Sequence, residues 1–236
     1  MPKFDSDPPF TPSCIKMLPA IEIETGPNPN AAVIWLHGLG DDGNGWSQVV
    51  PALDLPAALP VRFLFPHAPT MPVTINNGYV MRAWYDIRDA DLHARADLPG
   101  VRRSQAQLEA MLAHERARGV AAARIVLAGF SQGGAIALYT GLRHAERLAG
   151  VVALSTYLID APGLAAEAAA ANRDVPIFMA HGTYDPVVHV AWAEQSRDVL
   201  AGAGWRVEWH AYPMEHAAEP EEIAAVGEFL RRVLPA

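Results

Sequence analysis

Cysteine is almost absent from this 236-residue chain, which contains only Cys14. A single cysteine cannot form a disulfide within the chain, which fits a reducing compartment. Long apolar runs are missing too, so we expect no membrane span and no stable insertion into a membrane. The first residues lack the basic start and apolar centre of a secretory signal. We therefore expect a cytoplasmic protein.

Positive charge is scarce, because 18 Lys and Arg residues stand against 26 Asp and Glu residues, for a formal net charge of -8. The arginines are scattered, and an acidic chain has no electrostatic reason to bind nucleic acid. The histidines and carboxylates show no H-E-x-x-H or similar spacing of metal ligands. We expect no nucleic-acid partner and no metal ion.

Short apolar runs alternate with helical patterns along the chain. Runs such as AVIWL, IVLAG and VVAL are continuously apolar, which is typical of strands covered on both faces of a parallel sheet. We infer a mostly parallel sheet with helices on both faces, whose first strand could pair antiparallel at the edge. The expected strands span residues 15–24, 32–36, 61–65, 124–128, 150–154, 175–180 and 206–212.

Helical patterns fill several of the intervals between these strands. The expected helices include a segment from Val101 to Leu112 that Gly119 is placed to stop, residues 163–172, residues 190–203, and a C-terminal helix from Ile223 to Val233. Residues 66–99 fit no regular pattern, and a long irregular segment in a compact protein is often a functional loop. Length and apolar content suffice for one domain over residues 15–236, after an N-terminal arm over residues 1–14.

One serine lies between glycines where an expected strand turns into an expected helix, in the stretch GFSQGG from Gly129 to Gly134. A tight turn there forces its central residue into a strained backbone, and glycines two positions away avoid a collision of side chains. This arrangement is the nucleophile elbow G-x-S-x-G. The alternative is an ordinary helix N-cap serine. The strand–turn–helix context favours Ser131 as a catalytic nucleophile.

A serine nucleophile needs a histidine base and a carboxylate that orients this base. In the nucleophile-elbow architecture both follow the serine along the chain, the carboxylate first and the histidine second. Of the later histidines, His216 lies in a loop between the last strand and the last helix, at the sheet edge of the elbow. His210 falls inside a strand pattern and is a weaker candidate. Asp185 follows a strand in HGTYDP, also at the carboxyl edge, whereas Asp160 is a lesser candidate for the acid.

The oxyanion of an acyl-transfer intermediate needs preorganised N–H donors. Gln132, the residue after the nucleophile, supplies one. The glycine-rich loop HGLGDDGNG supplies the second, and the N–H of Leu39 is the expected donor. Phosphate binding is the rival for such a loop, but no Lys-Ser/Thr pair and no GxGxxG accompany it. His37 is expected to brace the loop by hydrogen bonding.

Taken together, these stretches resemble the phospholipase/carboxylesterase family of the α/β-hydrolases, which includes bacterial carboxylesterases and acyl-protein thioesterases. The resemblance runs from about Val33 to Leu234 and rests on blocks such as LHGLGDDGNGW, MRAWYDI, LAGFSQGGAIALYT, HGTYDPVV and YPMEHAAEPEEI. It implies an α/β-hydrolase fold without a large cap domain. It also implies the same nucleophile, acid, base and oxyanion donors, and it allows a homodimer.

Two residues depart from the family pattern. Glu215 stands beside the expected base where glycine is usual, and it either touches His216 or, as the favoured alternative, points to solvent. Thr156 stands near the expected acyl pocket, where many members have a small or different residue. The resemblance gives residues 66–99 the role of an acyl-binding wall. The expected substrate contacts are Met71, Val73, Ile75, Trp84, Leu158 and Val188, although Trp84 could instead pin this segment to the core.

The expected activity is cleavage of a carboxylic ester of short or medium acyl chain, through an acyl-enzyme on Ser131 and without a cofactor. The substrate would be a small-molecule ester or an acylated molecule. An acyl-protein thioesterase or lysophospholipase that acts on long acyl chains is the alternative, and a peptidase of the same fold is a weaker one. A non-catalytic binding protein on a hydrolase scaffold is the alternative from another class.

Overall fold

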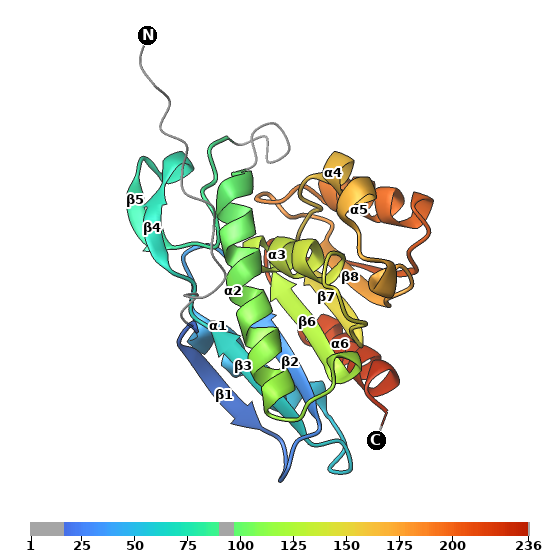
Figure 1. Cartoon of the computed structure of the whole chain (residues 1–236). Helices are drawn as coiled ribbons and strands as arrows, with labels where there is room; N and C mark the ends of the chain where they lie inside the picture. The colour runs from blue at the N-terminus through green and yellow to red at the C-terminus, as the bar shows by residue number, and fades with distance from the viewer. Residues whose placement is uncertain (1–16, 90–96, 236) are drawn as a thin grey trace.

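The computed structural model describes residues 17–89 and 97–235 (Figure 1). The strands of its main sheet are β1 Ala20–Glu24, β2 Ala31–Leu36, β3 Val61–Pro66, β6 Ile125–Phe130, β7 Gly150–Leu154, β8 Ile177–Gly182 and β9 Val207–Tyr212. They are ordered β1-β3-β2-β6-β7-β8-β9. All neighbours are parallel except β1 and β3, which pair antiparallel. The predicted parallel sheet and its antiparallel edge are both confirmed, whereas the predicted arm over residues 1–14 lies outside the described residues.

Helices cover both faces of this sheet, as predicted. One face carries α2 Leu98–Ala117, α3 Gln132–Gly141, α4 Ala161–Glu167 and α5 Val190–Gly202, and the other carries α1 Gly43–Ser47 and α6 Pro220–Val233. Every residue of β2 is buried, and alternate residues join different cores: Ile34 packs on the side of α2, Trp35 on the side of α6. Burial on both faces explains why these strands are continuously apolar.

The ends of the helices follow local signals in the sequence. Gly119 follows α2 with φ 94, in the left-handed region that glycine tolerates. Acidic residues lie in the first turn of α6 and arginines in its last turn, which suits the helix dipole. The alanine-rich segment differs from its prediction, since α4 ends at Glu167. Asn172 is buried at the end of a separate 3-10 turn, where its side chain donates hydrogen bonds to the carbonyls of His144 and Glu146. These bonds hold the chain away from the path of a continued helix.

A small hairpin occupies part of the segment that fitted no pattern. Its strands are β4 Thr70–Val73 and β5 Tyr79–Arg82, joined by the 3-10 turn η3 Thr74–Asn76, and they form a two-stranded sheet separate from the main sheet (Figure 1). Asn77 and Gly78 both have positive φ at the turn. An Asn-Gly pair between short apolar stretches is a hairpin signal. Its strands are too short and too exposed for periodicity alone to reveal them.

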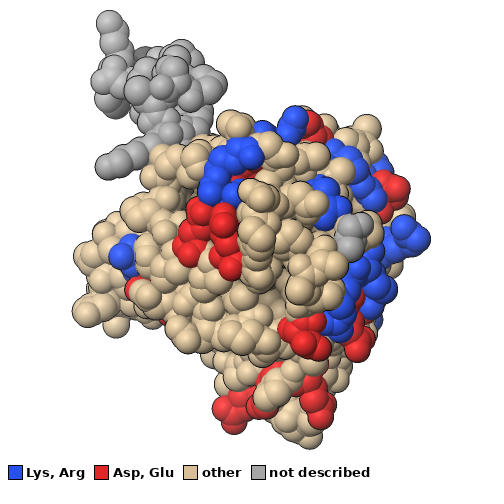
Figure 2. Space-filling model, turned by 90° about the horizontal axis from the view of Figure 1, so that it is seen from below, with Lys and Arg blue, Asp and Glu red and all other residues tan. Residues whose placement is uncertain are grey.

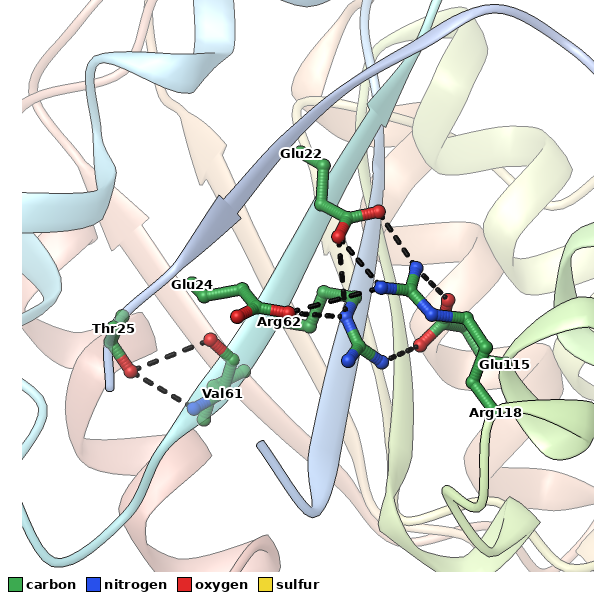
Figure 3. A network of polar contacts seen from close by, with 7 residues as sticks. All are labelled: Glu22, Glu24, Thr25, Val61, Arg62, Glu115 and Arg118. Carbon is green, nitrogen blue, oxygen red and sulfur yellow. Dashed lines mark hydrogen bonds and ion pairs between the residues drawn. The ribbon is translucent and has the colours of Figure 1, made fainter. Parts of the chain in front are cut away.

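The edge strand β1 is tied to β3 and α2 by an ion-pair network (Figure 3). Arg62 on β3 donates to the buried Glu115 of α2 at 2.7 Å and to Glu24 of β1 at 2.9 Å. Arg118 holds both oxygens of Glu22 at 2.7 Å. A carboxylate as buried as Glu115 is tolerated in the interior only with cations beside it. The network therefore fixes the outer strand to the helix layer.

Surface charges lie mostly in mixed pairs rather than in one basic patch. Arg102, for example, donates to Glu167 at 3.1 Å, and the same carboxylate accepts from the largely buried Arg143 at 2.7 Å. Figure 2 shows Lys and Arg lying beside Asp and Glu along one side of the face seen from below. Within residues 17–89 and 97–235, no helix combines the length and the apolar character needed to cross a bilayer.

Candidate active site

Ser131 lies at the turn from β6 to α3, at the carboxyl edge of the sheet. Its backbone has φ 54 and ψ -122, a strained conformation for a residue other than glycine. A Cβ on Gly129 would lie 2.4 Å from the carbonyl carbon of Gly133, and a Cβ on Gly133 would lie 2.4 Å from the carbonyl oxygen of Leu36. Only glycine fits at both positions, which is the physical reason inferred from the motif.

The structure brings the three residues selected from the sequence into one hydrogen-bonded series. His216 Nε2 lies 3.0 Å from Ser131 Oγ, and His216 Nδ1 lies 2.7 Å from Asp185 Oδ2. Asp185 follows β8 and His216 follows β9, so parallel strands deliver all three to the same edge. With Nδ1–H donating to the carboxylate, Nε2 is free to accept the proton of the serine hydroxyl.

The two weaker candidates have other partners. The carboxylate of Asp160 caps α4 by accepting from the N–H of Gly163 at 3.2 Å. His210 lies 3.0 Å from Glu208 on its own strand, β9. Both residues therefore fill ordinary structural roles away from the hydroxyl of Ser131.

The Asp185 carboxylate is buried and surrounded by donors. Its Oδ1 accepts from the N–H groups of Val187 and Val188, each at 2.8 Å. His181 Nε2 lies 3.4 Å from its Oδ2. Burial acts to raise the pKa of Asp185, but hydrogen bonds from His181, His216 and these backbone groups outweigh it and hold the pKa well below its usual range. The group is thus an anion that orients His216.

The two expected oxyanion donors line the same cavity as Ser131. Gln132 is the first residue of α3, so its N–H has no acceptor within the helix. Leu39 lies in the glycine-rich loop after β2. A Cβ on the neighbouring Gly38 would meet the ring of Phe130 at 3.3 Å, which brings this loop close to the elbow.

His37 braces the glycine-rich loop, as predicted. Its Nδ1–H donates to the Gly38 carbonyl at 2.7 Å, and its Nε2 accepts from the N–H of Ala68 at 3.0 Å. Burial lowers the pKa of His37, against the opposing effect of the bond to Gly38. A neutral ring is what this pattern requires, because one nitrogen must accept.

The side chain of Gln132 has a role that sequence reasoning missed. Its Oε1 accepts from the N–H of Trp84 at 2.8 Å, and its Nε2 donates to the carbonyl of Tyr85 at 2.7 Å. The Trp84 indole in turn donates to the carbonyl of His37 at 2.8 Å. These bonds fasten the chain after β5 to the elbow and to the oxyanion loop. No local pattern announces them, because the partners lie far apart in the sequence.

Ser131 and His216 open onto a cavity of about 780 Å³, a size typical of small-molecule sites. Of the six expected substrate contacts, Ile75 and Val188 line this cavity. The other four lie elsewhere: Met71, Val73, Trp84 and Leu158. All but Met71 are buried in the protein. Trp84 is therefore a structural brace, the alternative already weighed for it, and Met71 faces Met81 across the hairpin.

Most of the cavity wall comes from residues that were not singled out. The Phe130 ring centroid lies 4.7 Å from that of His216, and the Trp46 ring lies 5.1 Å from Phe130. Further apolar lining comes from segments distant in sequence: Val49, Ile87, Tyr157, Val187 and Trp192. Phe130 could have been found from its place beside the nucleophile, whereas the others depend on the folded arrangement.

The two departures from the family pattern have simple structural roles. Glu215 is exposed, in agreement with the favoured interpretation that it points to solvent. Thr156 is buried behind the elbow, where its Oγ1 donates to the carbonyl of Ser131 at 2.6 Å. Its methyl carbon would lie 2.9 Å from a Cβ on Gly134, so this side chain supports the start of α3 and does not line the cavity.

A mostly parallel sheet with helices on both faces, and a strained serine between β6 and α3, define the class as an α/β-hydrolase. No large cap domain covers the carboxyl edge within the described part of the chain. Among the same residues, no three His, Cys, Asp or Glu side chains gather in a way that could hold a metal ion.

Comparisons with known proteins give the family. The family model described as Phospholipase/Carboxylesterase matches residues 19–234. Acyl-protein thioesterase 1 of Neurospora crassa is 41% identical over 228 residues, which cover 93% of this chain and 91% of the relative. The crystal structure of Zea mays acyl-protein thioesterase 2 has a TM-score of 0.80 at 30% identity and covers 91% of this chain and 99% of that chain. The crystal structure of esterase PE8 has a TM-score of 0.79 at 27% identity and covers 93% of this chain and 100% of that chain.

The family match extends over most of the sequence, and the chain belongs to the phospholipase/carboxylesterase family. The resemblance inferred from its motifs is thereby confirmed. The protein is a carboxylic ester hydrolase, and its relatives include proteins named as thioesterases and as an esterase.

Proposed function

We propose that this protein cleaves acyl esters and thioesters in two steps, through an acyl-enzyme on Ser131. The observation that carries the proposal is the hydrogen-bond series from Asp185 through His216 to Ser131 at the cavity. A serine hydroxyl is a weak nucleophile by itself, and a histidine oriented by a buried anion is what activates it. The orphan N–H groups beside the serine suit a developing oxyanion.

In the first step, His216 Nε2 takes the proton of Ser131 as Oγ attacks the carbonyl carbon. The N–H groups of Leu39 and Gln132 hold the oxyanion, and Asp185 stabilises the imidazolium. His216 then gives its proton to the leaving oxygen or sulfur, and the carbonyl–leaving-group bond breaks. Water, deprotonated by the same histidine, hydrolyses the acyl-enzyme. No step requires a cofactor.

The substrate class follows from the cavity wall and from the relatives. Ile75, Ile87, Val188 and Trp192 offer an apolar lining that suits an acyl chain. The sequence favoured esters of short or medium chain, with an acyl-protein thioesterase as the alternative. Relatives named acyl-protein thioesterase, at 41% and 39% identity, support the alternative. We therefore propose thioesters as the better substrates.

The test is a matched series of p-nitrophenyl esters and S-acyl thiols, from acetyl to palmitoyl, with Ser131→Ala run beside the wild type. We expect Ser131→Ala to lose at least about a thousandfold in kcat on every substrate. We also expect higher kcat/KM for the thioester than for the oxygen ester of the same acyl chain. A Ser131→Ala protein that turns over at the wild-type rate would remove Ser131 from the mechanism.

The same variant separates the remaining alternatives. A binding protein on a hydrolase scaffold would bind acyl compounds without turnover, so the wild type and Ser131→Ala would give equal rates at background level. A peptidase would cleave p-nitroanilides of peptides faster than esters. Serine-dependent hydrolysis of esters, with negligible release of p-nitroaniline, is the result we expect.

A further inference from the structure

The cavity beside Ser131 is lined by one aspartate side chain, Asp41. Among its lining residues in the described chain, Asp41 is the only Asp, Glu, Lys or Arg. Asp41 is half-buried, and no Lys or Arg of residues 17–89 and 97–235 lies within ion-pair distance of it. A carboxylate on an otherwise neutral, largely apolar wall is screened less than one in open water. It therefore sets a negative potential in the cavity.

This carboxylate lies on a defined part of the wall. A Cβ on Gly45 would stand 2.4 Å from Asp41 Oδ2, so the glycine leaves the space that the carboxylate occupies. Trp46, the next residue, contacts Phe130, whose ring packs on His216. Asp41, Gly45, Trp46 and Phe130 thus form a continuous surface that reaches the base, and we name it the leaving-group wall.

The position of His216 determines which part of a substrate contacts the leaving-group wall. His216 must pass its proton to the leaving oxygen or sulfur, so the leaving group departs on the side of its Nε2. Phe130 is the part of the wall that touches the His216 ring, and Asp41 lies farther along it. Aromatic rings beside a carboxylate are the surroundings in which organic cations bind well.

We propose that the leaving-group wall favours esters and thioesters whose alcohol or thiol portion carries a positive charge, with Asp41 as the specificity-determining residue. The inference rests on the proposed function of Ser131. Oγ of Ser131 bonds to the acyl carbon, and the bond from that carbon to the leaving oxygen or sulfur breaks. The leaving atom takes the proton from His216, so the cationic alcohol or thiol departs with its charge unchanged.

The experiment compares butyrylcholine with neohexyl butyrate, in which a carbon replaces the ammonium nitrogen and the shape is kept. The quantity measured is the ratio of their kcat/KM values. We expect the wild type to prefer the cationic ester, and Asp41→Asn to lower this ratio about fivefold, as for a partly exposed charge pair. Added salt should lower the wild-type ratio and leave that of the variant almost constant.

Asp42→Asn is the matched control, because it removes the same charge one residue away. Asp42 caps α1 through the N–H of Asn44 and does not line the cavity, and asparagine caps helices equally well. Its ratio should equal that of the wild type. Equal losses in both variants, or a wild type that does not discriminate between the two esters, would overturn the role of Asp41.

Two further measurements complete the design. Hydrolysis of neohexyl butyrate that depends on Ser131 shows that the proposed function holds even where the charge preference fails. An S-butyryl-cysteine peptide with flanking lysines, compared with its N-acetyl-lysine counterpart, tests the same chemistry on a polypeptide. A preference abolished by Asp41→Asn on the peptide identifies an acylated basic protein as the source of the cation. A preference for the cationic substrate that is confined to butyrylcholine identifies a small ester as the source of the cation.

Discussion

At the scale of single residues, His181 is a partner of the acid, Asp185. Its ring is fully buried, and its Nε2–H donates to the carbonyl of Val188 at 2.7 Å while lying 3.4 Å from Asp185 Oδ2. His181→Leu removes this donor, so the carboxylate and its loop lose a constraint on their position. We expect kcat to fall about tenfold with KM unchanged, because His181 does not line the cavity.

His181→Gln separates positioning from simple packing, because its amide N–H can replace the imidazole donor. We expect this variant to regain most of the wild-type kcat, while both variants unfold at similar temperatures. If Leu and Gln lower kcat equally, the hydrogen bond to the acid loop has no part in the reaction.

The same scale shows why the sequence predicts some site residues and misses others. Ser131, Asp185 and His216 were found because strand order and a glycine-flanked turn place them at one sheet edge. Val73 and Trp84 were assigned to the acyl wall from their segment alone. Whether a side chain in such a segment points into a cavity or into the core depends on contacts with distant elements, such as that between Trp84 and Gln132.

At the scale of elements, the strands of the main sheet could be read from the sequence because burial on both faces leaves a continuous apolar run. The hairpin β4–β5 could not, since each strand has four residues and its fold depends on contacts outside it. The N–H of Gly40 donates to the carbonyl of Arg82 at 2.9 Å, for example, and couples the hairpin to the oxyanion loop. The stop of α2 before Gly119 and the end of α6 at Val233 were predictable because such signals are local, whereas both helices begin earlier than the predicted Val101 and Ile223, at Leu98 and Pro220.

The attachment of β1 gives a prediction at this scale. Arg62→Met removes the cation that lies 2.7 Å from the fully buried Glu115. Glu115 then keeps only the hydrogen bond from Arg118 at 3.0 Å, and the poorer compensation of this buried carboxylate should lower the free energy of unfolding by about 2 kcal/mol, measured by urea denaturation. Replacing both residues, as Arg62→Met with Glu115→Leu, should restore most of that loss, because no buried charge remains. Equal stability of the wild type and Arg62→Met would contradict this role, and kcat should change in neither variant.

At the scale of the whole molecule, ion-paired carboxylates make the stability of the folded protein depend on pH in the acid range. A hydrogen bond from Arg118 lowers the pKa of Glu22, and one from Arg143 lowers that of Glu167. A carboxylate whose pKa is lower in the folded protein than in the unfolded chain contributes its full stabilisation at pH values above the unfolded pKa. This stabilisation is lost as the pH falls through the folded pKa. Each of these surface pairs contributes little alone, because solvent screens it. Together with Asp185, they should make stability decline below about pH 4.

Glu222 acts in the opposite direction. It is fully buried in the first turn of α6, neither of its oxygens has a hydrogen-bond partner among the described residues, and burial raises its pKa from 4.5 to about 8. Between these values the unfolded chain ionises Glu222 while the folded chain keeps it protonated. The free energy of unfolding should therefore fall as pH rises from 4.5 to 8, by up to about 1.4 kcal/mol per pH unit. Glu222→Gln, which cannot ionise, should flatten this slope in urea unfolding between pH 5 and pH 8. Glu221→Gln, one residue away and exposed, should keep the wild-type slope, and equal slopes in all three proteins would mean that Glu222 ionises freely in the folded state.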